Sequence, residues 1–285
     1  MLPSIQQSAL ARWGYRGYVA LFFGYLVLPL AVTAAFAFND SLFPSLPWKG
    51  FTLDWFVNAT QPKLGLLHDP SILRGIGNSL VIACWTTALS LAVGTTNAFL
   101  FERYDFPGRE FAYVLMLTPL VIPGVILGIS ILVLASSVAN AVEDAHGIDL
   151  EWLRPGRVLV VLGQFSFVAT IATLVISARL RKLDRSLEEA AYDLGATRFT
   201  VLRTITLPYL KPALIGSGLV AFLISFENFN TTLMLVGSDS PLTITMFDRM
   251  KEGSTPVLNA VSLFLMVASA LLAAISILAQ RDRRA

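Results

Sequence analysis

The chain has 285 residues, of which 55% are hydrophobic and only 14% charged, and its formal net charge at pH 7 is +2. Soluble domains carry about 25% charged residues, so this composition excludes a soluble globular domain and predicts a protein embedded in lipid. The single cysteine, Cys84, excludes an intrachain disulfide. Because it lies in an apolar run, we interpret it as a small buried hydrophobe.

Six apolar stretches follow one another, each near the ~20 residues that a helix needs to cross a bilayer. We interpret the first as an uncleaved anchor, since a signal-peptide core has only ~7–15 apolar residues. Prolines and glycines interrupt the third, at Pro119, Pro123, Gly124 and Gly128. The predicted fold class is all-α, a single transmembrane domain (1–285) with six helices. The predicted spans are about 18–38, 75–101, 111–135, 158–178, 212–236 and 257–279.

Basic residues are divided unequally among the segments between these spans. The leader, the second and fourth loops and the tail hold twice as many Lys and Arg residues as the other three loops. Loops rich in Lys and Arg stay in the cytoplasm. We therefore expect both termini, and the loop 179–211, to be cytoplasmic.

The loop 179–211 is polar and charged, and it contains signals for two short helices. Ser186 and Glu189 have the spacing of a capping box, with Ser186 as the N-cap. Gly195 can adopt the left-handed conformation that ends a helix. A second helix, from about Thr197 to Leu207, is expected to end where Pro208 forbids continuation.

The spacing Glu-Ala-Ala, Gly and Ile-x-Leu-Pro in this loop resembles the cytoplasmic coupling loop of permease subunits of binding-protein-dependent (type I) ABC importers. The matching residues are Glu189, Ala190, Ala191, Gly195, Ile205, Leu207 and Pro208. The resemblance implies that the loop docks in a groove of an ATPase, and that this permease lies in a bacterial cytoplasmic (inner) membrane. The implied coupling residues are Glu189, Ala190, Ala191, Asp193 and Gly195. The alternative is an ordinary amphipathic loop helix.

No Gly-x-x-x-x-Gly-Lys-Ser/Thr phosphate loop occurs in the sequence, so ATP hydrolysis is expected on another chain. The resemblance implies two ATPase subunits that bind ATP and Mg, a second related permease and an extracytoplasmic substrate-binding protein. Membrane lipid is the remaining expected partner, and nucleic acid is not expected. Because hydrolysis is expected on another chain, we expect no catalytic residue or cofactor in this one. We expect no metal site either, since the loop residue His146 has no second His or Cys nearby.

Glu227 is an ionisable residue within the predicted fifth span. Counted from Pro212, it lies about 22 Å into a core of about 30 Å. An ionisable group inside a bilayer costs on the order of 2.5–3.5 kcal/mol and marks function. A carboxylate beside aromatic rings suits a cation, so we predict a substrate path of Glu227, Asn228, Asn230, Phe226 and Phe222. The alternative is that Glu227 pairs with a group on a partner subunit.

Four further segments resemble the second permease of spermidine/putrescine importers, which implies a polyamine-like solute. They are Phe38-Asn39-Asp40, Gly50-Phe51-Thr52, Ser225-Phe226-Glu227-Asn228 and Thr255-Pro256-x-x-Asn259-Ala260. Polyamine permeases often have paired acidic residues where this chain has Glu227-Asn228. An opine, an aminophosphonate or another small solute therefore stays open.

A different class, an ion-coupled secondary transporter, would use Glu227 as its proton site. Such transporters contain internal repeats with interrupted helices at corresponding positions. Here the breakage is mainly in the third span, without a matching partner. The sequence therefore favours the importer permease.

Overall fold

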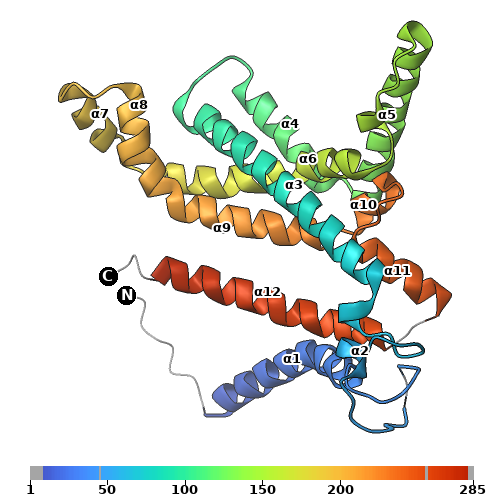
Figure 1. Cartoon of the computed structure of the whole chain (residues 1–285). Coiled ribbons are helices and arrows are strands. Elements are labelled where there is room, and N and C mark those ends of the chain that lie inside the picture. The colour runs from blue at the N-terminus through green and yellow to red at the C-terminus, as the bar shows by residue number, and fades with distance from the viewer. Residues whose placement is uncertain (1–8, 45, 254–255, 282–285) are drawn as a thin grey trace. The chain divides into compact units, whose positions relative to one another are not determined.

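The computed structural model describes residues 9–44, 46–253 and 256–281, which form helices joined by loops (Figure 1). Five helices are long and apolar enough to cross a membrane, and Val257–Leu271 forms a shorter apolar helix. Within the described residues, β-structure is limited to one isolated bridge between Asn39 and Phe51. The all-α prediction with six candidate spans is confirmed.

The helices divide between two compact units. The first contains the chain up to Asp69 together with Arg249–Ala268, and the second contains Pro70–Asp248 and the chain from Ser269. In chain order the elements are α1 (Ala9–Phe36), α2 (Asp54–Val57), η1 (Leu66–His68), α3 (Pro70–Arg103), α4 (Arg109–Val121), α5 (Gly124–His146), η2 (Glu151–Leu153), α6 (Arg157–Leu180), α7 (Arg185–Asp193), α8 (Arg198–Val201), η3 (Leu202–Thr206), α9 (Leu207–Phe226), α10 (Asn230–Leu235), α11 (Leu242–Glu252) and α12 (Val257–Arg281).

In the first unit, the loop after α1 folds back on itself. The side chain of Asn39 accepts a hydrogen bond from the Lys49 backbone N–H at 3.0 Å. The backbone carbonyl of Asn39 accepts a second hydrogen bond, from the indole Nε1 of buried Trp55, at 2.9 Å. Phe38 stacks on Phe51 with ring centroids 5.2 Å apart. Trp55 thus packs inside the unit, whereas Phe51 is 68% exposed.

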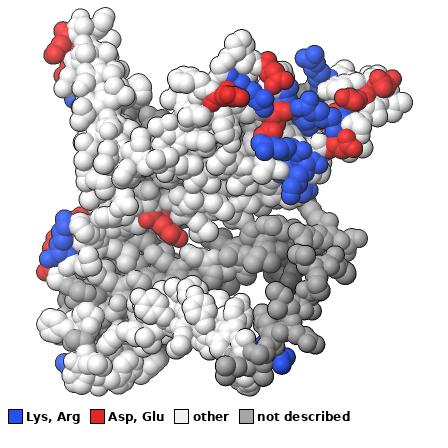
Figure 2. All heavy atoms as spheres, turned by 180° about the vertical axis from the view of Figure 1, so that it is seen from behind, with Lys and Arg blue, Asp and Glu red and all other residues white. Residues whose placement is uncertain are grey.

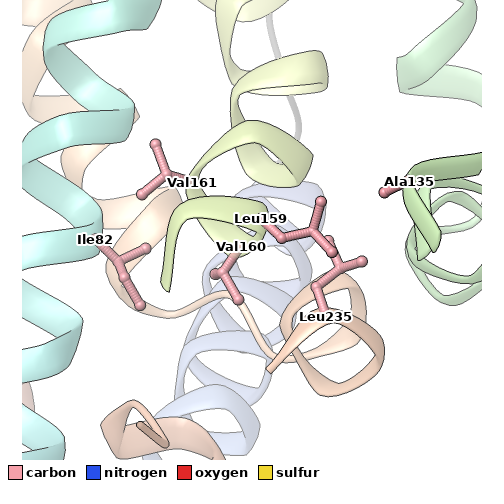
Figure 3. Packing of buried hydrophobic residues seen from close by; sticks show 6 residues of the cluster. All are labelled: Ile82, Ala135, Leu159, Val160, Val161 and Leu235. Carbon is pink, nitrogen blue, oxygen red and sulfur yellow. The ribbon is translucent and has the colours of Figure 1, made fainter. Parts of the chain in front are cut away.

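In the second unit, α3, α6 and α9 pack against one another (Figure 1). Lipid tails are as apolar as leucine, so close packing through small residues, rather than exclusion of water, holds such helices together. Gly94 of α3 provides this closeness: a Cβ there would lie 2.9 Å from Cβ of Ala172 in α6. Figure 3 shows a second contact region, where Ile82 of α3 and Leu235 of α10 meet the first turn of α6.

The predicted third span is two helices, α4 and α5, which diverge at Ile122–Pro123 (Figure 1). A residue before proline is pushed out of the helical region, and Ile122 is extended with ψ 129°. Beyond the break, α5 continues to His146, well past the predicted end at residue 135. The proline therefore ends one helix and lets the next start in a new direction.

The predicted fifth span, 212–236, begins too late and misses a break. One continuous apolar helix runs over Arg198–Phe226, so the prediction that Pro208 ends a helix was wrong. The reason is the π-helical turn η3, in which the Leu207 N–H reaches back five residues to the carbonyl of Leu202. The wider π-helical turn accommodates Pro208, which has no backbone N–H to donate. The helix instead ends at Phe226, and α10 starts at Asn230.

Two smaller expectations also fail. The segment 237–256 was predicted to be a loop but contains α11, whose first turn buries Leu242 and Ile244. The backbone N–H of Leu242 donates to Ser79 Oγ of α3 at 2.9 Å, a tertiary contact that no local pattern reveals. Cys84 is exposed rather than buried.

Substituting Gly94→Ala is expected to push α3 and α6 apart, since the new Cβ would also lie 3.0 Å from the Thr173 backbone nitrogen. Overpacking of this kind costs about 1–3 kcal/mol, so the apparent melting temperature of the detergent-solubilised protein should fall. Gly77→Ala is the matched control on the same helix, since nothing lies within 4 Å of its Cβ position. Equal melting temperatures for both variants would contradict the packing argument.

Candidate functional site

The first candidate site is the break between α9 and α10. Glu227 is the C-cap of α9, and its N–H donates to the carbonyl of Leu223 at 3.0 Å. Its side chain is exposed, and among the described residues it has no ion pair or side-chain hydrogen bond. The carboxyl end of a helix carries partial negative charge. The carboxylate of Glu227 adds a full negative charge, so the electrostatic potential at the break is negative.

A buried chain of hydrogen bonds holds the break together. Ser225 Oγ, before the break, donates to Gln164 Oε1 of α6. Gln164 Nε2 donates to Thr232 Oγ1, beyond the break, at 2.8 Å. Thr232 Oγ1 in turn donates to Asn228 Oδ1 at 2.9 Å. Gln164, Ser225 and Thr232 are at most 3% exposed, so one α6 side chain connects the two halves of the span. We call these four residues the Gln164 relay.

Glycines allow α10 to sit close to α5 and α6. A Cβ at Gly128 of α5 would lie 2.9 Å from the carbonyl oxygen of Thr231, and one at Gly163 of α6 would lie 2.2 Å from Leu235 Cδ1. The N–H of Gly156 donates to the Leu235 carbonyl at 3.0 Å, which caps the end of α10. The short helix after the break is therefore held by backbone contacts as well as by the relay.

The predicted path residues occupy different positions around this break. Phe222 and Phe226 stack along the last turns of α9, with centroids 5.9 Å apart. Glu227 and Asn230 are exposed. The Oδ1 of Asn228 is engaged by Thr232, and its backbone carbonyl accepts from Thr243 Oγ1 at 3.2 Å. Asn228 thus holds the backbone at the break in place. The Glu227 carboxylate, in contrast, has no ion pair or side-chain hydrogen bond among the described residues.

Sequence reasoning did not find Gln164, Ser225 or Thr232 as partners. A signal was present for Gln164, because it is an amide within the otherwise apolar run of the fourth span. Polar residues in membrane helices face the protein interior. Which group each one meets depends on helix packing.

The second candidate site is the α7–α8 segment. Its first helix starts two residues earlier than predicted, because Asp184 is the N-cap and its carboxylate accepts from the Ser186 N–H at 3.0 Å. The proposed Ser186–Glu189 capping box was wrong. Asp is as good an N-cap as Ser. Hydrogen bonds from the Ser186 backbone, and then from its side chain, lower the pKa of Asp184 below its ordinary value of 3.8.

Gly195 ends α7, as predicted. Its φ is +85°, in the region that favours glycine. The Ala196 N–H donates to the Ala191 carbonyl at 3.0 Å, and the Gly195 N–H to the Tyr192 carbonyl at 2.9 Å. These two bonds form a Schellman motif. α8 then begins with Thr197 as its N-cap, which accepts from the Thr200 N–H.

The predicted coupling residues lie largely on the surface of this segment. Glu189, Ala190 and Asp193 are exposed, and Ala191 is half-buried. Two large apolar side chains stand out beside them, with Leu194 89% and Phe199 69% exposed. Figure 2 shows charged side chains gathered over this end of the second unit (upper right). The segment thus presents both charge and apolar area.

Comparison with known proteins places these features in a family. Residues 87–281 match the family described as "Binding-protein-dependent transport system inner membrane component". The putrescine transport system permease protein PotI of Escherichia coli is 31% identical over 247 residues, covering 86% of this chain and 82% of PotI. The E. coli spermidine/putrescine permease protein PotC is 27% identical over 268 residues, covering 94% of each chain.

Solved structures agree on the fold. A chain of a bacterial ABC transporter that imports the acidic polysaccharide alginate aligns with a TM-score of 0.76 and 17% identity, covering 95% of both chains. A chain of the MetNI methionine ABC transporter aligns with a TM-score of 0.58 and 14% identity over 74% of this chain and 95% of that one.

The chain therefore belongs to the family of binding-protein-dependent transport system inner membrane components, and it is a permease subunit of an ABC importer. This membership decides against the ion-coupled secondary transporter.

Replacing Gln164 by Leu should destabilise the second unit, because Ser225 Oγ would lose its buried partner, whereas Thr232 Oγ1 would keep its bond to Asn228 Oδ1. Each unsatisfied buried group costs about 1–3 kcal/mol, so the apparent melting temperature should fall clearly. Ser166→Ala is the control on the same helix, since it removes only a local bond from Ser166 Oγ to the Gly163 carbonyl. A Gln164→Leu variant as stable as Ser166→Ala would argue against the relay.

Proposed function

We propose that this permease conducts a small cationic solute of the polyamine class, and that its α7–α8 segment couples it to a separate ATPase. The observation that carries the proposal is Glu227, an exposed carboxylate at the carbonyl end of a broken apolar helix. The names of PotI and PotC, which refer to putrescine and spermidine transport, support the solute class.

A cation suits this break for three physical reasons. The Glu227 carboxylate supplies a full negative charge, and the end of α9 adds a partial one. The stacked rings of Phe222 and Phe226 offer faces to which an ammonium group is attracted. The break also frees backbone groups near the carboxylate. Non-helical backbone within a membrane is tolerated where it is buried in protein or lines a water-filled cavity, and a solute path is such a cavity.

The proposed complex contains this chain, a second related permease, two ATPase subunits that bind ATP and Mg, and an extracytoplasmic binding protein. Hydrolysis takes place on the ATPase subunits. ATP binding favours an outward-facing arrangement, the binding protein delivers the solute, and hydrolysis returns the path to the inward-facing state. Each ligand shifts the equilibrium only by its differential affinity for the two states.

In the proposed topology both chain termini and the α7–α8 segment face the cytoplasm, where ATP is available. The excess of Lys and Arg in the corresponding segments supports this orientation. In the α7–α8 segment, the exposed residues Glu189 and Asp193 offer charge, while Leu194 and Phe199 offer apolar contact area.

The test is the ATPase activity of the reconstituted complex with its binding protein, measured with putrescine, spermidine, an opine, an aminophosphonate and a neutral amino acid. Stimulation by the polyamines alone is expected. Stimulation by a neutral or anionic compound alone would leave the importer intact but refute the cationic path.

Replacing Glu227 by Gln should lower the efficiency of putrescine uptake by about tenfold or more. A hydrogen bond to a charged group is worth about 1.5–3 kcal/mol, and 1.4 kcal/mol corresponds to a factor of ten. The amount of assembled complex should not change, because Glu227 has no ion pair or side-chain hydrogen bond among the described residues. Loss of assembly would instead favour the alternative that Glu227 pairs with a partner subunit.

Reversing the charge of Glu189 by Glu189→Lys should reduce co-purification of the ATPase and uptake together, since Glu189 is exposed and free to contact a partner. The control is Glu252→Lys. Glu252 is an exposed carboxylate at the end of α11, in the segment between the fifth and sixth spans, which the predicted topology places on the extracytoplasmic side. Co-purification and uptake equal to those of the control would remove Glu189 from the coupling surface.

A further inference from the structure

We propose that Arg103, Glu188 and Thr206 form a mechanical link that carries a displacement of α7 to α3 and α9 at once. We call these three residues the Glu188 link. The inference rests on the proposed coupling of α7–α8 to an ATPase. It concerns Glu188, the residue before the Glu-Ala-Ala motif, as a positioning residue rather than as a contact with the ATPase.

The two carboxylate oxygens of Glu188 contact two different parts of the chain. Oε2 lies 3.0 Å from Arg103 Nη2, at the last residue of α3. Oε1 accepts a hydrogen bond from Thr206 Oγ1 at 2.6 Å. The side chains of Arg103 and Glu188 are each 15% exposed, and Thr206 is buried. A single side chain of α7 thus joins two candidate spans.

Arg103 depends on this contact. Its Nε and Nη2 are both buried and make no hydrogen bond among the described residues, so the 3.0 Å contact of Nη2 with Glu188 is an ion pair without hydrogen-bond geometry. Of the described acidic residues, Glu188 is the one that forms an ion pair with it. Removing the charge of Glu188 would therefore leave a largely buried guanidinium without its ion-pair partner, and we expect this to weaken the hold of α7 on the end of α3.

A cavity of about 720 Å³ lies at the link, and Arg103 and Glu188 both line it. Phe99 of α3, Tyr192 of α7 and Leu202 of η3 contribute to the same lining. Because none of its residues is fully buried, α7 has little packing that competes with the Glu188 link.

Thr206 is the last residue of the π-helical turn η3, which leads directly into α9. Isolated π-turns inside α-helices frequently mark functional sites. The hydrogen bond from Thr206 to Glu188 therefore lies at the point where the backbone changes from π-helical to α-helical hydrogen bonding. Glu188 is therefore placed to move the start of α9 together with α7.

The test measures distances between spin labels in the complex with the ATPase, without nucleotide and after trapping with ATP and vanadate. Exposed Ser186 of α7 is labelled together with either Leu100 of α3 or Lys211 of α9, in a Cys84→Ala background. With the link intact, both distances should be the same in the two states. In Glu188→Gln, at least the distance to α3 should shift or broaden on trapping.

Four variants distinguish a specific link through Glu188 from a general contribution of these residues to stability. Exchanging the charges by Arg103→Glu with Glu188→Arg should restore the constant distance to α3, whereas Arg103→Glu alone should not. Thr206→Val should affect chiefly the distance to α9. Glu110→Gln, an exposed carboxylate at the start of α4, is the matched control.

Transport gives a second readout. The ratio of ATP hydrolysed to putrescine imported should rise several-fold in Glu188→Gln, whereas simple loss of folded complex would lower both rates and leave the ratio unchanged. Constant label distances in Glu188→Gln, or distances that already change with the link intact, would overturn the link alone. Failure of any ATPase to co-purify with the unmodified chain would refute the proposed function and the link with it.

Discussion

A membrane helix can break only where its freed backbone groups find partners in the protein or in a water-filled cavity, because the lipid core supplies none. At the break after Glu227, the Asn228 carbonyl accepts from Thr243 Oγ1 and the Thr232 N–H donates to Asn228 Oδ1. The Gln164 relay connects Ser225 before the break with Thr232 beyond it. Glycines on α5 and α6 let the short helix α10 approach closely enough for backbone contacts. The broken span is thus a stable structure, and it leaves the carboxylate of Glu227 exposed.

Both candidate sites use the same device, one side chain that contacts two elements through its two polar atoms. Gln164 uses its amide oxygen and nitrogen, and Glu188 uses its two carboxylate oxygens. In each site an exposed acidic residue stands next to the bridged structure: Glu227 beside the relay, and Glu189 beside the Glu188 link. In the proposed function, the exposed residue of each site is the one that contacts another molecule.

Much of the fold could be predicted because apolar length and turn chemistry are local properties. The six apolar stretches and the helix end at Gly195 are of this kind. The prolines predicted helix ends less well, because the effect of a proline depends on the backbone hydrogen bonds around it. Pro123 separates two helices, whereas Pro208 lies within one, because the π-turn before it had already shifted the hydrogen bonds. The capping box at Ser186 failed because Asp184, two residues earlier, caps the same helix.

By itself, the sequence determined that this is a helical membrane protein, that it resembles importer permeases, and which short segment carries the Glu-Ala-Ala motif. These properties follow from composition and from residues near one another in the chain. Only the tertiary structure decided that Glu188, and not Glu189, contacts Arg103 and Thr206. It likewise decided that Gln164 closes the break some sixty residues further along the chain. Such contacts depend on helix rotation and packing, which the order of residues along a single helix does not specify.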